Sequence, residues 1–137
     1  MQEGPGTRVP GPSCFNVQMT TPQYAPQPFS PADEKLWATL IHLSAFIIGF
    51  WGPLIGYLVL KERGAFVRQH VTEALNFHIS VTIYGVAIGI LSLPTFGLAA
   101  FLYLPLGILV IVFMIQAAIA ANRWAYYRYP LSIRLVK

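Results

Sequence analysis

Three long apolar stretches, separated by short polar segments, dominate the chain after residue 31. They cover approximately residues 36–60, 72–93 and 98–121. Each is long enough to cross a bilayer as a helix, which requires about 20 mostly apolar residues. Ser30-Pro31, a capping serine followed by proline, predicts the start of the first helix. The pattern therefore predicts an all-α integral membrane protein with about three transmembrane helices.

The first apolar stretch contains a helix-breaking sequence, Gly52-Pro53. A proline inside a helix removes one backbone hydrogen bond, and its ring clashes with the preceding turn. We therefore expect one kinked or broken span over residues 36–60. The alternative is a helical hairpin, in which residues 33–51 cross alone and residues 53–62 lie at the interface.

The residues before the first span differ in composition from the rest. Residues 1–31 contain seven prolines and three glycines, which predicts a disordered tail because such a segment buries too little apolar surface to offset its ordering entropy. Met19 offers an alternative translation start within it. Cys14 is the only cysteine, so neither an intramolecular disulfide nor a cysteine metal cluster can form. The remainder divides into a helical membrane domain, residues 32–123, and an interfacial C-terminal segment, residues 124–137.

Polar residues are concentrated on one side of the second span. At about 100° per residue they fall within an arc of about 120°, which we call the polar seam. Unpaired polar groups are costly in lipid, so we expect the seam to face protein and to bond across helices, with Gln116 of the third span as its natural partner. A proton or cation relay through His70, Glu73 and Asn76 is the alternative. The seam consists of Gln69, His70, Glu73, Asn76, Ser80 and Tyr84.

The C-terminal segment combines aromatic and basic residues with a two-residue repeat. Its aromatic residues and one arginine predict anchoring at the interface between membrane and water. Residues 131–136 alternate with a period of two, which predicts a short extended stretch lying on the membrane surface. The predicted anchors are Trp124, Tyr126, Tyr127, Arg128 and Tyr129.

Basic residues follow the first and third spans. With three spans both basic groups lie on the same side of the membrane, which the positive-inside rule makes cytoplasmic. The C-terminus is then cytoplasmic and the N-terminus outside, in the plasma (inner) membrane, whereas a helical hairpin would move the N-terminus to the cytoplasm. The basic groups are Lys61, Arg63 and Arg68 after the first span, and Arg123, Arg128, Arg134 and Lys137 after the third.

Composition agrees with a membrane protein and argues against a nucleic-acid-binding protein. The chain is 55% hydrophobic and 10% charged, with a mean hydropathy of +0.58, which is more apolar than a typical soluble domain. The net charge of +4 is small and dispersed, unlike the clustered basic surface that binds nucleic acid. The sequence contains no phosphate loop, nucleophile elbow or metalloprotease helix, so we expect neither enzymatic activity nor a bound cofactor.

Two spacings indicate contacts between helices. Gly52 and Gly56, like Gly85 and Gly89, form GxxxG patterns that let helix backbones approach closely, either within the chain or in an oligomer. The pair His42 and His78 lies at similar depth in antiparallel spans, and two such histidines can ligate haem b. A hydrogen-bonded packing role for each histidine is the more ordinary interpretation.

Four sequence blocks resemble a known family. In their order they resemble a family of small prokaryotic membrane proteins classed as domain of unknown function 4870, which is distantly grouped with the chloroplast inner-envelope protein-import component. The resemblance implies a small helical membrane domain over residues 33–137 and supplies no established activity. Thr72 stands where that family usually has lysine. The blocks are D-E-K-L-W-A-T-L-I-H-L-S at 33–44, G-P-L-I-G-Y-L at 52–58, F-V-R-Q-H-V-T-E-A-L-N-F at 66–77 and Y-Y-R-Y-P-L-S-I-R at 126–134.

These features favour a non-enzymatic structural or accessory subunit of a membrane assembly. Its partners are then the lipid bilayer and either further copies of the chain or other membrane proteins. An alternative from another class is an oligomeric transport or translocation element, with a polar path along Asn76, Ser80 and Gln116. A third interpretation is a haem-binding redox module that uses His42 and His78.

Overall fold

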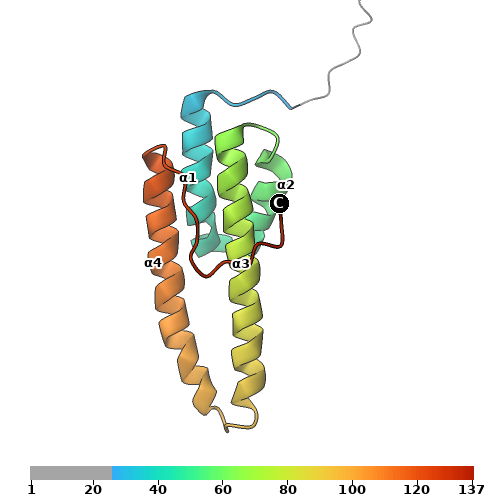
Figure 1. Cartoon of the computed structure of the whole chain (residues 1–137), viewed down its shortest axis with the longest axis vertical. Helices are drawn as coiled ribbons and strands as arrows, with labels where there is room; N and C mark the ends of the chain where they lie inside the picture. The colour runs from blue at the N-terminus through green and yellow to red at the C-terminus, as the bar shows by residue number, and fades with distance from the viewer. Residues whose placement is uncertain (1–25) are drawn as a thin grey trace, which may run out of the picture.

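The computed structural model describes residues 26–137, and in this part of the chain all regular secondary structure is helical. The all-α prediction is therefore confirmed. The disordered tail, the start at Met19 and the lone Cys14 concern residues 1–25 and lie outside the described residues, except that the predicted tail extends to Pro31. The helices are α1 (Pro31–Ile48), α2 (Trp51–Leu60), α3 (Ala65–Ser92), the 3-10 helix η1 (Leu98–Leu102) and α4 (Tyr103–Asn122) (Figure 1).

The first apolar stretch forms a helical hairpin. The Ser30 hydroxyl accepts a hydrogen bond from the Asp33 N–H at 3.2 Å, so α1 begins at the predicted cap. The chain then reverses at Gly49, whose φ of 57° is one that favours glycine, and α2 runs back beside α1 (Figure 1).

This hairpin corrects the expected kinked span over residues 36–60. The break lies at residues 49–50, before Gly52-Pro53, and Pro53 falls in the first turn of α2. A proline there costs little, because the N–H groups of the first turn have no partner within the helix. The structure is closer to the hairpin alternative, but α2 packs against both α1 and α3 instead of lying alone at the interface.

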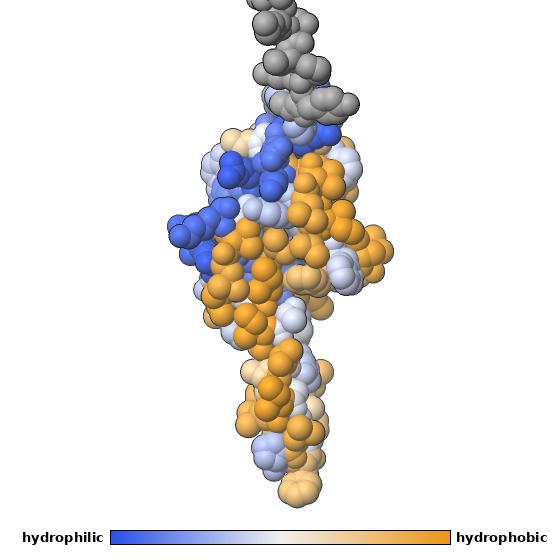
Figure 2. All heavy atoms as spheres, turned by 90° about the vertical axis from the view of Figure 1, so that its right-hand side faces the viewer, coloured by the Kyte–Doolittle hydropathy of each residue, from blue (hydrophilic) through white to orange (hydrophobic). Residues whose placement is uncertain are grey.

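Two helices are long and apolar enough to cross a membrane: α3, and the continuous helical stretch Leu98–Asn122. The three expected spans are thus reduced to two candidates, because α1 and α2 share the first stretch. Gly97, with a φ of 87°, closes the turn between η1 and the end of α3. Figures 1 and 2 show α3 and α4 continuing well beyond the α1–α2 hairpin as a narrow stem.

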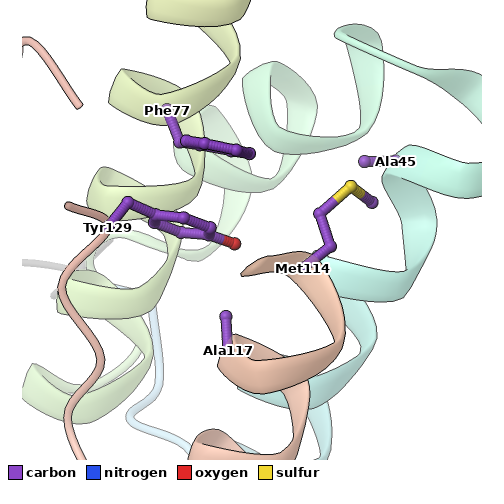
Figure 3. Packing of buried hydrophobic residues seen from close by; sticks show 5 residues of the cluster. All are labelled: Ala45, Phe77, Met114, Ala117 and Tyr129. Carbon is purple, nitrogen blue, oxygen red and sulfur yellow. The ribbon is translucent and has the colours of Figure 1, made fainter. Parts of the chain in front are cut away.

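We define the stem as residues 83–109 and the head as residues 26–82 and 110–137. Ala99 is the only buried residue of the stem, and the face visible in Figure 2 is mostly hydrophobic. The hydrophobic core lies in the head, where Ala45, Phe77, Met114, Ala117 and Tyr129 pack together (Figure 3). A second buried group joins Ile41, Leu60, Val67 and Val71 between α1, α2 and α3.

The start of α1 and the C-terminal segment lie at the same end of the molecule. The Glu34 carboxylate accepts hydrogen bonds from the Phe66 and Val67 N–H groups, at 3.0 and 3.2 Å, and so caps α3 from another helix. The Phe66 ring in turn contacts Trp124 of the C-terminal segment, with ring centroids 4.7 Å apart. The start of α1 and the C-terminal segment thus share one end of the molecule, because the hairpin returns the chain to its starting level.

Both GxxxG patterns are used for contacts within the chain. A Cβ at Gly56 would overlap the Ile41 side chain on α1, and one at Gly52 would overlap Ser44. On the stem, the Tyr103 hydroxyl donates to the Gly85 carbonyl at 2.7 Å and lies against Gly89. The glycines therefore allow α2 to approach α1 and α3 to approach the start of α4.

Replacing Gly56 with leucine tests this packing. We expect Gly56→Leu to destabilise the head by about 1–3 kcal/mol, because a side chain there displaces the buried Ile41. The matched control is Gly107→Leu on α4, where a Cβ would meet nothing within 4 Å, and there we expect no loss. Thermal unfolding of the purified protein in detergent measures both. Equal melting temperatures for the two variants would contradict the close approach of α2 to α1.

Candidate functional site

The polar seam of α3 is covered by the C-terminal segment of the same chain. After Asn122 the chain crosses the head and lies along α3, without helix or strand from residue 124 onward (Figure 1). Asn76 makes the most contacts: its Oδ1 accepts from the Leu135 and Val136 N–H groups at 3.0 and 2.7 Å, and its Nδ2 donates to the Val136 carbonyl at 2.8 Å. One buried amide thus binds the backbone of two consecutive residues.

Deeper seam residues continue this pattern toward the stem. The Ser80 hydroxyl accepts from the Ile133 N–H at 2.7 Å and donates to the carbonyl of Asn76, also at 2.7 Å. The Tyr84 hydroxyl donates to the Leu131 carbonyl at 2.9 Å. The backbone of residues 131–136 therefore finds in the side chains of α3 the partners that a neighbouring strand would otherwise supply.

The spacing of the two elements explains why they fit. Successive contacts move four residues along α3, from Tyr84 to Ser80 to Asn76, which is about 6 Å of helix rise. The C-terminal segment moves two residues over the same contacts, and two extended residues span about 6.6 Å. A bond from the Leu135 N–H to the Ile133 carbonyl, at 3.1 Å, shortens the last step. The polar repeat of the helix and the two-residue repeat of the segment therefore stay in register.

Glu73 holds the C-terminal segment near the end of the seam that is farthest from the stem. Its Oε1 pairs with the Arg134 Nε at 3.2 Å, and its Oε2 accepts from the Tyr129 N–H at 3.4 Å. Glu73 is buried whereas the Arg134 side chain is 44% exposed, so the pair lies at the edge of the head. Because the carboxylate also accepts the Tyr129 N–H, its negative charge is stabilised by both the Arg134 guanidinium and a backbone N–H.

Tyr129 ties the C-terminal segment into the core. Its ring stacks on Phe77, with centroids 4.0 Å apart (Figure 3), and its hydroxyl lies 2.9 Å from the His42 Nδ1. The His42 Nε2 lies 3.0 Å from the His70 Nδ1, which completes a buried chain of three polar side chains. Burial raises the pKa of Tyr129, so its hydroxyl keeps its proton and can donate to the imidazole of His42.

The hydrogen bonds of these side chains argue against a haem ligated by His42 and His78. Both ring nitrogens of His42 are engaged, and the His78 Nδ1 bonds the Ala74 carbonyl of its own helix at 2.9 Å. Within residues 26–137, no group of three or more His, Cys, Asp or Glu side chains is arranged to hold a metal ion. The site is thus a network of side chains that binds backbone.

The chain matches the model of a known protein family. The model of the magnetosome magnetite crystal formation protein family (MamF/MmsF) matches residues 33–136, which extend from the first turn of α1 almost to the end of the C-terminal segment. The chain belongs to this family. No curated protein and no solved structure matches it.

The family match corrects the resemblance to domain of unknown function 4870 and to the chloroplast import component. That resemblance depended most on E-A-L-N-F at 73–77 and Y-R-Y-P at 127–130. Both blocks lie where the C-terminal segment meets α3, through Glu73, Phe77 and Tyr129. They describe this packing and were not sufficient to identify the family. Membership in a magnetosome family, together with the two long apolar helices, makes the chain a membrane-associated protein.

The other predicted residues take varied positions. Gln116 does not contact the seam: it is exposed on α4, and its Oε1 accepts from the Tyr127 hydroxyl at 2.9 Å. Gln69 lines an open polar cleft with Lys61, Arg68 and Lys137. The remaining anchors lie at the head end of the molecule: the rings of Trp124 and Tyr126 contact Phe66, and Arg128 is exposed.

Two residues of the site escaped sequence reasoning. Glu34 has the position of an ordinary first-turn acid, but it binds the N-terminus of α3. Gly64 makes this possible, since any side chain there would overlap the Glu34 carboxylate. From the sequence, Arg134 was recognisable as a basic residue in an alternating stretch, but its partner was not. The available signal was that neither Glu73 nor Arg134 has a clear partner nearby in the sequence.

Removing the Asn76 amide should release the C-terminal segment. Asn76→Ala leaves the Val136 N–H and carbonyl without their partner and the Leu135 N–H with the Ile133 carbonyl alone, so we expect a loss of about 2 kcal/mol and an opening about 30-fold more frequent. The probe is Ser132→Cys, because Ser132 is half-buried and its Oγ is buried in the closed state, in a Cys14→Ser background. The rate of labelling by a water-soluble maleimide measures the opening.

The control for this experiment is Thr82→Ala, which removes a hydroxyl of α3 that bonds its own helix and lies outside the seam. Its labelling rate should equal that of the Ser132→Cys parent. If Asn76→Ala also left the rate unchanged, the segment would not depend on the seam.

Proposed function

We propose that the chain is a non-enzymatic structural or accessory protein of the magnetosome membrane. Family membership supports a role in the formation of magnetite crystals. The observation that carries the structural role is that the chain fills its own polar seam. Asn76 and Ser80, the side chains that a substrate path would have to offer, are bonded to residues 133–136. This arrangement supports a rigid head in preference to a translocation path.

The distribution of charge supports one orientation in the membrane. The basic residues of the described chain lie in the head, and the turn at residues 94–97 carries no charge and exposes Phe96 fully. By the positive-inside rule the basic end of the head is cytoplasmic, and the rest of the head and the stem enter the membrane with the turn directed toward the compartment of the crystal. Both the start of α1 and the C-terminal segment are then cytoplasmic. The basic residues are Lys35, Lys61, Arg63, Arg68, Arg123, Arg128, Arg134 and Lys137.

The stem and the exposed apolar faces of the head contact the bilayer or other membrane proteins in this proposal. Val86, Ile90, Phe101 and Ile108 are among the exposed apolar side chains of the stem, and the Tyr103 hydroxyl of α4 bonds the Gly85 carbonyl of α3 there. A stem with so little internal packing is suited to surroundings of lipid or of neighbouring helices. The head then holds a fixed surface on the cytoplasmic side.

Cysteine labelling of isolated magnetosomes tests the orientation. In a Cys14→Ser background, Ala32→Cys and Leu135→Cys should react with a membrane-impermeant maleimide on intact magnetosomes, because both positions are exposed on the head. Phe96→Cys should react only after detergent is added. Labelling of Ala32→Cys and Leu135→Cys from opposite sides would contradict the hairpin topology.

Deletion and complementation in a magnetosome-forming host test the role. Loss of the gene should change the size or number of magnetite crystals seen by electron microscopy, and the wild-type gene should restore them. Asn76→Ala should restore them less well at equal protein level, since it loosens the head. Thr82→Ala, which removes a hydroxyl bonded to its own helix, serves as the matched control and should restore them fully. Unchanged crystals after deletion would count against the proposal.

A further inference from the structure

A groove on the outer face of the α1–α2 hairpin is not used by the network described above. It has a volume of about 510 Å³, which lies within the range of roughly 300–1,000 Å³ typical of ligand sites. Its walls are apolar, from Trp37, Leu40 and Ile48 on α1 and from Ile55 and Val59 on α2. Most of these side chains are exposed, so the groove is open to whatever surrounds the hairpin.

The groove has one charged residue, Arg63, which follows the end of α2. Its guanidinium lies over the Phe29 ring, 5.5 Å from the centroid, and its Nη1 donates to the Gln27 carbonyl at 3.2 Å. The buried Nε has no hydrogen-bond partner within residues 26–137, and no carboxylate of this part of the chain pairs with the guanidinium. A positive charge therefore stands at one end of an apolar groove with no anion to match it.

We propose that this groove binds one anionic phospholipid, with the phosphate on Arg63 and an acyl chain between α1 and α2. An apolar groove that ends in an unpaired arginine is complementary to an amphiphile with a negative head. Arginine suits phosphate because its planar N–H groups match the phosphate oxygens. Arg63 also lies at the basic end of the molecule, level with the α2–α3 loop, where lipid headgroups would be found.

Other occupants fit less well. An apolar helix of a second copy would cover the walls but leave the arginine unpaired. Inorganic phosphate or a phosphorylated headgroup without chains would pair with Arg63 and leave the apolar walls uncovered. Only an amphiphile satisfies both parts of the groove, and the bilayer supplies one at high local concentration.

Native mass spectrometry of the full chain tests the site. The protein is purified in mild detergent, stripped of lipid and mixed with either phosphatidylglycerol or a diacylglycerol that carries the same acyl chains and no phosphate. We expect a one-to-one adduct that favours phosphatidylglycerol by about tenfold, the factor that one charge-assisted hydrogen bond supplies. Glycerol phosphate, the headgroup without chains, should give no adduct at the same concentration.

Three variants separate the two parts of the groove. Arg63→Gln removes the charge and Val59→Trp fills the apolar part while the charge stays, so each should lower phosphatidylglycerol binding by about tenfold. Arg123→Gln, an exposed arginine after α4 and outside the groove, is the matched control and should change binding less than twofold. Circular dichroism verifies that each variant is folded. If Arg63→Gln fails to fold, the lipid preference of the wild type and the effect of Val59→Trp decide the matter.

The proposal is overturned by any of four results. These are equal binding of the two lipids by the wild type, unchanged binding by folded Arg63→Gln, unchanged binding by Val59→Trp, or an equally strong adduct with glycerol phosphate. Lipid-free dimers that crosslink through Ile55→Cys would assign the groove to a second copy and would also overturn it. None of these outcomes depends on the proposed role in crystal formation.

Discussion

The structure depends on the need to pair the backbone of a non-helical segment inside a helical protein. A helix satisfies its own N–H and C=O groups, but residues 131–136 cannot, and an unpaired buried amide costs about 1–3 kcal/mol. Asn76, Ser80 and Tyr84 meet this need because they repeat every four residues along α3. Once the segment is held there, Tyr129 stacks on Phe77 and reaches His42. The core of the head thus includes a residue from outside the helices, and its order depends on the seam.

The α1–α2 hairpin gives the molecule its unequal ends. Because the chain turns back at Gly49, the head contains four helical segments while only α3 and α4 continue into the stem. Glu34 strengthens this arrangement by capping α3 from α1, so the hairpin is held at its open end as well as along its length. The same turn brings the start of α1 to the level of the C-terminal segment. Buried groups are therefore concentrated in the head, whereas exposed apolar groups occur on both the head and the stem.

The sequence patterns identified both the polar seam and residues 131–136, but they did not show that the two pack together. The helical rotation of about 100° per residue located the seam, and a two-residue repeat located residues 131–136. Each pattern describes a single element and does not indicate what that element packs against. The depth of Gln116 in the third span favours it as the partner of the seam. The observed partner is the backbone of the C-terminal segment, which no pattern of side chains reveals. The helix break also differs from its predicted position. Proline is the usual helix breaker, but Pro53 is tolerated in the first turn of α2 and the chain reverses at Gly49.

The closed seam also limits where the function of this family member can lie. In a membrane protein, buried polar residues are the usual candidates for a transported ion or a substrate. Here Glu73, Asn76 and Ser80 are already bonded within the chain, so any other ligand would have to displace six backbone and side-chain contacts of residues 129–136. The groups still available to partners lie on the surface: the basic side chains of the head, the open groove at Arg63 and the apolar sides of the stem. In the role that we propose, the protein acts through these surfaces, and its internal polar network keeps them in place.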